Sequence, residues 1–183
     1  MTRLTALNPE EATGKTKELF NAVQAKLGVI PNMMRTMGNS PAILEGYLNL
    51  SGALSHGKLS AKTGELLALA ISESNSCDYC LAAHTFIGEK LAKATPEVLH
   101  AARKGNSTDA KTNAILQFAK TLISKNGIVN DEDVNKVKNA GVSDAEISEI
   151  VGHVALNILT NYFNNTANTE IDFPTVPSLE FQK

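Results

Sequence analysis

Residues 77–84 read Cys77-Asp78-Tyr79-Cys80-Leu81-Ala82-Ala83-His84 and contain both cysteines of the chain. On a helix, side chains three, four and seven positions apart share one face. At about 100° per residue, Cys77, Cys80 and His84 fall within roughly 60° of one another. The spacing therefore predicts two thiols and an imidazole on one stripe. Cys80 and His84 are close enough to touch, and the two thiols can close a disulfide if the first turn permits.

A second helix is expected directly before this stretch. Ser60 is a typical N-cap residue, and the helix that follows it is expected to run to about Asn75. If this helix and the cysteine helix form an antiparallel hairpin, Glu65 lies about ten residues before the turn and His84 about eight after it. At a rise of about 1.5 Å per residue, the two side chains lie at similar positions along the axis of the hairpin. Glu65 is then placed to orient the imidazole and to receive its proton, although a helical glutamate more often only contacts solvent.

These residue types suit thiol chemistry. The thiolate, not the thiol, is the nucleophile, and a free cysteine with a pKa near about 8.5 is mostly protonated at neutral pH. A neighbouring imidazole takes the proton, and a helix N-terminus favours the anion. A second cysteine one turn away can condense with a sulfenic acid before it is oxidised further.

The remaining sequence predicts an all-α fold, a helical bundle built around the hairpin that carries the Cys-x-x-Cys pair, and no strand alternation is found. A single domain is expected over residues 1–183, with a motif-bearing core at about 45–125, a C-terminal helix at about 143–168 and an irregular tail at 172–183. The expected helices run from Asn8 to Gly28, from Ser40 to Leu54, from Ser60 to Asn75, from Cys77 to about Ala94, from Thr95 onward, from about Thr108 to Lys125, from Asn130 to Ala140 and from Ser143 to about Asn168.

Composition excludes several classes of protein. Of the 183 residues, 43% are hydrophobic and 20% charged, as in an ordinary soluble chain, and the net charge of −2 disfavours nucleic acid as a partner. The longest apolar run, Leu66 to Ile71, is far shorter than the ~20 residues of a membrane span. Residues 1–14 do not resemble a signal peptide. Two close cysteines suit a reducing compartment, so a cytoplasmic location is expected.

Two structural alternatives exist for the cysteines. Both can be buried core residues, or they can bind structural zinc together with His84. A zinc site needs a fourth ligand, which would be His56, His100 or His153. None of the three lies in a paired ligand motif.

The last long helix carries a polar stripe. His153, Asn157, Asn161, Asn164 and Asn168 recur at helical spacing and fall within about 80° of one another. Asparagine has poor helix propensity, so helix formation alone does not explain four asparagines on one face of this helix. A solvent-exposed face is the favoured interpretation, and a pocket wall or a polar subunit contact near the thiols is the alternative. His153 and Asn161 are possible auxiliary site residues.

The order Glu65, eleven residues, Cys77-x-x-Cys80 and then His84 resembles the signature of the alkylhydroperoxidase D and carboxymuconolactone decarboxylase family. The flanking segments resemble the family as well, and two C-terminal segments resemble its peroxidase-related branch. The flanking segments are Leu66-Leu67-Ala68-Leu69-Ala70-Ile71-Ser72 and Ala82-Ala83-His84-Thr85, and the C-terminal ones are Asn161-Tyr162-Phe163-Asn164 and Glu170-Ile171-Asp172-Phe173-Pro174.

The resemblance implies an all-helical homo-oligomer that reduces hydroperoxides, needs a thiol or dithiol donor and uses no cofactor or metal. It implies that Cys80 reacts with the peroxide, that Cys77 resolves the product, and that His84 and Glu65 relay the proton. Some alkylhydroperoxidases carry a second histidine where this chain has Tyr79, so the chain relies on His84 alone or uses the Tyr79 hydroxyl.

Three other functions stay open. A dithiol–disulfide oxidoreductase would use the same thiols without peroxide. Lactone decarboxylases of the family do not depend on a Cys-x-x-Cys pair, so the presence of both thiols argues against that chemistry. The third is a non-enzymatic helical oligomer that binds zinc.

Overall fold

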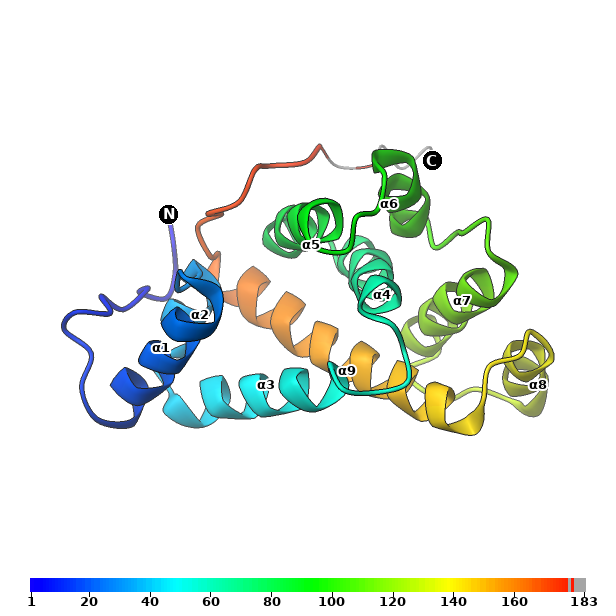
Figure 1. Cartoon of the computed structure of the whole chain (residues 1–183), viewed down its shortest axis with the longest axis horizontal. Coiled ribbons are helices and arrows are strands. Elements are labelled where there is room, and N and C mark those ends of the chain that lie inside the picture. The colour runs from blue at the N-terminus through cyan, green and yellow to red at the C-terminus, as the bar shows by residue number, and fades with distance from the viewer. Residues whose placement is uncertain (178, 180–183) are drawn as a thin grey trace.

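The chain is described by a computed structural model over residues 1–177 and 179. Nine helices and no strand occur among these residues, which confirms the predicted all-α fold (Figure 1). In chain order they are α1 (Gly14–Leu27), α2 (Asn32–Met37), α3 (Pro41–Leu54), α4 (Ala61–Ser74), α5 (Asp78–Lys90), α6 (Pro96–Arg103), α7 (Ala110–Ser124), α8 (Asp131–Asn139) and α9 (Asp144–Ala167). In the described part of the chain, none of the helices combines the length and the apolarity that crossing a bilayer requires.

Side-chain caps begin the helices that frame the centre of the molecule. The Ser60 hydroxyl accepts a hydrogen bond from the backbone N–H of Thr63 and so caps α4. Ser143 and Glu146 form a reciprocal capping box at the start of α9. Each cap satisfies backbone donors that the first helical turn leaves free. The helix starts predicted at Ser60 and Ser143 are therefore confirmed.

The first helix begins later than expected, at Gly14 instead of near Asn8. The Asn8 side chain accepts a hydrogen bond from the backbone N–H of Glu10 at 3.1 Å, which closes a local turn. Gly14 has a φ of +55°, in the left-handed region, so a regular helix cannot continue through it. The proline after Asn8 thus belongs to a turn and not to a helix start.

Two further boundaries differ from the prediction. Pro31 lies between the first two expected helices and precedes a short helix, α2, that is absent from the expected set. The cysteine helix α5 ends at Lys90 and not near Ala94. Lys93 has a φ of +54°, which turns the chain toward α6. Short segments of this kind carry too few periodic residues for the sequence to define their ends.

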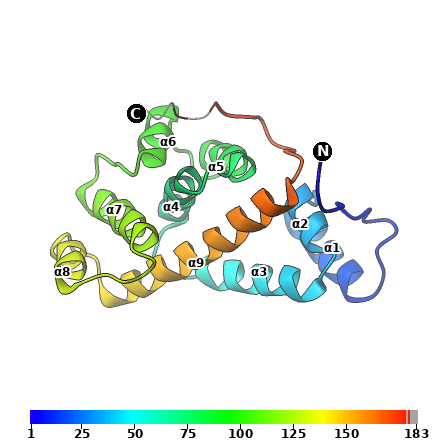
Figure 2. The ribbon, with the colours of Figure 1, turned by 180° about the vertical axis from the view of Figure 1, so that it is seen from behind.

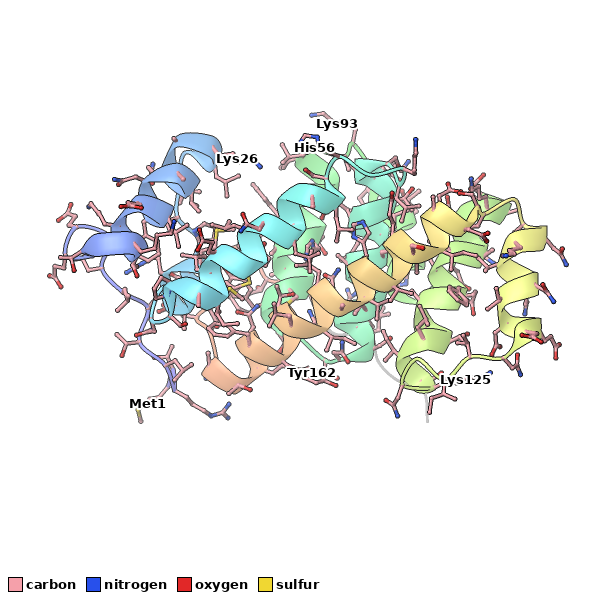
Figure 3. All side chains as sticks on the ribbon, turned by 90° about the horizontal axis from the view of Figure 1, so that it is seen from below. Met1, Lys26, His56, Lys93, Lys125 and Tyr162 are labelled. Atoms are coloured by element: carbon pink, nitrogen blue, oxygen red, sulfur yellow. A yellow bond between two sulfur atoms is a disulfide. The ribbon has the colours of Figure 1, made fainter. Side chains whose placement is uncertain are left out.

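The hairpin of α4 and α5 lies at the centre of the molecule, and the long helix α9 crosses beneath it (Figures 1 and 2). Helix α3 packs against α9, and a view from below shows the two side by side, with Tyr162 at the outer edge of α9 (Figure 3). The described residues that follow α9 are not helical, and residues 178 and 180–183 of the expected irregular tail lie outside the described residues. Helix α9 is therefore enclosed by helices on more than one side.

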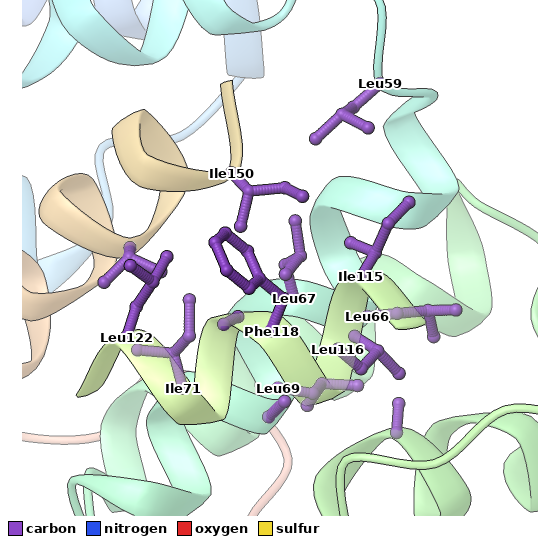
Figure 4. Close-up of a cluster of buried hydrophobic side chains, with 14 of the residues drawn as sticks. Leu59, Leu66, Leu67, Leu69, Ile71, Ile115, Leu116, Phe118, Leu122 and Ile150 are labelled. Atoms are coloured by element: carbon purple, nitrogen blue, oxygen red, sulfur yellow. The ribbon is translucent and has the colours of Figure 1, made fainter. Parts of the chain in front are cut away.

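Two clusters of buried hydrophobic side chains flank the hairpin. The larger joins α4 to α6, α7, α8 and α9, and its side chains include Phe118 of α7, Leu67 and Ile150 (Figure 4). The smaller joins α1, α2 and α3 to the start of α5 and includes Cys77 and Cys80. The thiols thus belong to the apolar packing between the N-terminal helices and the hairpin.

Leu67→Ala is expected to lower the free energy of unfolding by about 2–5 kcal/mol, because the fully buried side chain leaves a cavity that its neighbours fill only in part. Urea denaturation followed by circular dichroism measures the change. Val151→Ala is the control, since Val151 is exposed and its loss should cost at most about 0.5 kcal/mol. Equal losses from both variants would contradict the packing described for α4.

Candidate active site

The two cysteines lie at the N-terminus of α5 and form a disulfide, with their Cα atoms 5.3 Å apart. Cys77 is the N-cap residue, and its sulfur accepts a hydrogen bond from the backbone N–H of Cys80 at 3.3 Å. The helix N-terminus therefore directs a backbone donor at sulfur, as expected where a thiolate is to be stabilised. The prediction that the first turn lets the pair close is confirmed.

The two sulfur-bearing residues differ in access. A cavity of about 370 Å³ opens beside the start of α5, and the described residues that line it include Cys80 but not Cys77. Both residues are buried, with Cys77 at 0% and Cys80 at 2% exposure, so the difference between them is that only Cys80 borders the cavity. A molecule in the cavity can therefore reach Cys80 and not its partner.

Glu65 of α4 and His84 of α5 meet across the hairpin. The Nδ1 atom of His84 lies 2.8 Å from the Glu65 carboxylate, and both residues line the cavity. The predicted approach of the two side chains is thus confirmed. A proton on Nδ1 is held by the carboxylate in this contact, which leaves Nε2 as the ring nitrogen able to accept a proton.

Tyr79 lines the cavity, but its hydroxyl is engaged elsewhere, where it accepts a hydrogen bond from the Met33 backbone N–H at 3.2 Å. Burial raises the pKa of Tyr79, and the nearby Asp172 carboxylate adds to this. The phenol therefore stays protonated near neutral pH and cannot serve as a base for a thiol. Of the two options for this chain, the geometry favours His84.

His153 lines the same cavity. Burial lowers the pKa of His153, while the charges of Glu149 and Glu65 act in the opposite direction. The ring is therefore mostly neutral near neutral pH and adds no fixed positive charge to the cavity.

The polar stripe of α9 is buried, so the favoured interpretation of an exposed face is wrong. Asn157, Asn161 and Asn164 are each at most 5% exposed, and only Asn168 at the C-cap is exposed. Asn157 and Asn164 line the cavity. The reason is tertiary: α9 is covered by α3 on one side and by the hairpin on another, so its polar face points inward.

Asn161, a predicted auxiliary residue, connects helices instead of lining the cavity. Its Oδ1 atom accepts a hydrogen bond from Asn75 at 2.9 Å, and its Nδ2 atom donates to the Ser72 hydroxyl at 3.3 Å. The amide thereby joins α9 to α4 and to the turn of the hairpin. No contact between Asn161 and a thiol is found among the described residues.

Tyr47 of α3 is a cavity residue that the sequence did not single out. Burial raises the pKa of Tyr47 to about 12, and the charge of Glu65 contributes to the rise. Tyr47, Ser51 and Leu54 all line the cavity and lie four and three positions apart. This helical spacing is the signal that identifies α3 as a cavity wall once the position of the cavity is known.

The rest of the cavity wall is mostly apolar, and none of the described residues that line it is lysine or arginine. The apolar lining includes Leu27, Val29, Pro31, Met33, Met34, Leu54, Leu59, Phe86, Ile87, Leu91, Leu156 and Phe173. Such a wall suits an uncharged, apolar molecule.

The described residues contain no group of three His, Cys, Asp or Glu side chains arranged to hold a metal ion. His56 and His100, two of the possible fourth zinc ligands, are exposed. The zinc alternative thus has no ligand set in the described part of the chain.

Comparison with known proteins finds a family that resembles the segment carrying this arrangement. The sequence profile of the carboxymuconolactone decarboxylase family matches residues 41–124, the segment that carries Glu65, both cysteines and His84. Residues 41–124 therefore resemble the carboxymuconolactone decarboxylase family. The match begins at the start of α3 and ends at the end of α7, so the family segment contains the hairpin but not α9.

Solved structures share the fold over nearly the whole chain. A peroxidase-related protein with an alkylhydroperoxidase core from Ralstonia eutropha JMP134 has a TM-score of 0.83 and 23% identity, covering 93% of this chain and 92% of that one. A peroxidase-related protein from Silicibacter sp. TM1040 has a TM-score of 0.78 and 23% identity, covering 93% and 94%. A variant of the debrominase Bmp8 in complex with 2,3,4-tribromopyrrole has a TM-score of 0.77 and 20% identity, covering 94% and 92%. No match was found among curated proteins.

Proposed function

We propose that this protein is a thiol-dependent peroxidase that reduces organic hydroperoxides through a dithiol–disulfide cycle of Cys77 and Cys80. One observation carries the proposal: Cys80 borders an apolar cavity that also contains the Glu65–His84 pair, while Cys77 lies behind it within disulfide distance. The cavity therefore brings together a nucleophile and a proton acceptor, and the resolving thiol lies outside the cavity within reach of the nucleophile.

The cycle begins with the Cys80 thiolate, whose proton has passed to His84. Its sulfur attacks the outer peroxide oxygen, the S–O bond forms, and the O–O bond breaks. The alkoxide leaves with the electron pair and takes up a proton returned through His84. The Cys77 thiol then attacks the sulfenic sulfur, which forms the disulfide and releases water. A thiol or dithiol donor reduces the disulfide and restores both thiols.

The substrate class follows from the cavity wall. Its apolar lining accommodates the organic part of an alkyl or aryl hydroperoxide, which hydrogen peroxide lacks. A decarboxylase substrate carries a carboxylate, which would meet the Glu65 charge without any lysine or arginine among the described lining residues. The cavity therefore favours a neutral hydroperoxide over an anionic lactone.

The reduced protein is expected to lose two thiols per chain and two protons in mass when it reacts with one equivalent of cumene hydroperoxide. Thiol titration and intact-mass spectrometry measure both changes, and stopped-flow kinetics should show faster oxidation by cumene hydroperoxide than by hydrogen peroxide. The double variant with serine at both positions is the control and should not change in mass. If the reduced protein does not react with peroxides but undergoes thiol–disulfide exchange, it is instead a dithiol–disulfide oxidoreductase.

A second candidate is reductive dehalogenation, because the apolar cavity beside Cys80 can also hold a halogenated ring, and a debrominase shares the fold. In that reaction two thiols supply two electrons, a C–Br bond is replaced by C–H, bromide leaves, and the disulfide forms. Release of bromide from 2,3,4-tribromopyrrole by the reduced protein, without reaction toward hydroperoxides, would favour this candidate over the peroxidase.

A further inference from the structure

Asn164 on α9 contacts the reactive sulfur. Its Nδ2 atom donates a hydrogen bond at 3.3 Å to the Cys80 sulfur, which in the structure is bonded to Cys77. The residue is 3% exposed and lines the cavity. A fixed N–H group beside sulfur stabilises the thiolate more than the thiol, because hydrogen bonds to a charged acceptor are the stronger ones.

The other end of the same amide is unused. The Oδ1 atom of Asn164 is buried and has no hydrogen-bond partner among the described residues. Asn161, one turn earlier, has partners for both ends of its amide. A buried carbonyl without a hydrogen-bond partner lowers the stability of the folded protein, so packing alone does not explain why the atom is there.

The orientation of the amide follows from the chemistry of sulfur. A thiolate only accepts hydrogen bonds, so the N–H side of Asn164 must face Cys80. The reverse orientation would set the carbonyl oxygen against the sulfur lone pairs. The unpaired acceptor is therefore held beside the reactive sulfur, in a residue of the cavity wall.

We propose that Asn164 binds both reactants, with its N–H group on the Cys80 thiolate and its carbonyl oxygen accepting a hydrogen bond from the O–H group of the hydroperoxide. The inference rests on the proposed peroxidase function and assigns a substrate-binding residue to it. A hydroperoxide has one O–H donor, and it lies on the outer oxygen that the thiolate attacks. One amide thus sets the sulfur and the target oxygen side by side.

Each bond that forms when the Cys80 thiolate attacks the hydroperoxide is matched by a bond that breaks. The S–O bond forms at the outer oxygen, the O–O bond breaks, and the electron pair leaves on the inner oxygen as alkoxide. The outer O–H group becomes the hydroxyl of the sulfenic acid and keeps its hydrogen bond to Asn164. The same residue then holds the sulfenic acid until Cys77 attacks it.

Asn164→Leu in a Cys77→Ser background tests both contacts on a single thiol. Loss of the N–H group should raise the pKa of the Cys80 thiol and lower the rate of alkylation by iodoacetamide at pH 7 by about tenfold. At a pH high enough to ionise the thiol fully, alkylation should return to the parent rate. Oxidation by cumene hydroperoxide should stay about fivefold slower there, because the acceptor for the O–H group is gone.

Asn165→Ala is the matched control, because Asn165 is the next residue on α9 and is exposed. It should change neither rate. Asn164→Leu should unfold at the same or a higher denaturant concentration than its parent, since it removes a buried unpaired carbonyl. If it does not fold, Asn164→Ala is measured in its place.

An unchanged thiol pKa together with an unchanged ratio of peroxide to alkylation rates would overturn the inference. Lower stability with equal losses in both rates at every pH would also overturn it, because Asn164 would then be structural. If the parent itself reacts with cumene hydroperoxide no faster than free cysteine does, the proposed function fails and the peroxide contact fails with it. In that case the alkylation rates still test whether the N–H group of Asn164 stabilises the Cys80 thiolate.

Discussion

Cys80→Ser is expected to abolish peroxide consumption, whereas Cys77→Ser should still react once and leave a sulfenic acid on Cys80. The reason is access, since Cys80 borders the cavity and Cys77 does not. His84 also lies one turn after Cys80 on the same helix and can take its proton. Stopped-flow oxidation measures the single turnover, and trapping with dimedone followed by mass spectrometry identifies the sulfenic acid.

The loss in Cys80→Ser should reach the background rate of peroxide decay, because the remaining cysteine, Cys77, is fully buried and does not border the cavity. Circular dichroism of both variants is the control for folding. The opposite pattern, with a trapped sulfenic acid on Cys77 in Cys80→Ser, would assign the attack to the N-cap cysteine. The cavity would then have to open onto Cys77 before reaction.

His84→Ala is expected to slow the oxidation of Cys80 by at least about tenfold near neutral pH, with a smaller loss in the same direction for Glu65→Gln. In the proposed cycle the imidazole takes the thiol proton, and the carboxylate at 2.8 Å holds the ring in position to do so. Raising the pH should restore much of the rate, because hydroxide then removes the proton that the pair would have taken. Stopped-flow measurements from pH 6 to about 9 follow the rescue.

Glu18→Gln is the control for the loss of a carboxylate, since Glu18 is exposed on α1. It should leave the rate and its pH dependence unchanged. If Glu65→Gln behaves in the same way, Glu65 only supports the packing of the hairpin. If His84→Ala is slow at every pH with no rescue, the imidazole acts on a later step than ionisation of the thiol.

The fold class and the core of the site could be predicted because they depend on local spacing. Cys77, Cys80 and His84 lie on one helix, where periodicity alone sets the face that they share. Glu65 lies on the adjacent helix of a tight hairpin, so counting residues from the turn was enough to place it near His84. The N-caps at Ser60 and Ser143 are likewise contacts between near neighbours in the chain.

The same reasoning failed where the partner lies far along the chain. The spacing of the α9 asparagines was clear, but whether the stripe faces solvent depends on helices that are distant in sequence. Its partners are Ser72, Asn75 and Cys80, which lie more than eighty residues before it. Tyr47 was missed for the same reason, since the sequence of α3 does not indicate which of its faces borders Cys80.

By itself, therefore, the sequence determined the helices, the shared face of the two thiols and His84, and the approach of Glu65 across the hairpin. That Cys80 and not Cys77 borders the cavity, and that Asn164 directs its amide at the Cys80 sulfur, depends on the tertiary packing. The difference lies in the distance along the chain over which each effect acts. Helical periodicity and hairpin register act over a few turns, whereas burial and cavity walls arise only when α3, α9 and the hairpin pack together.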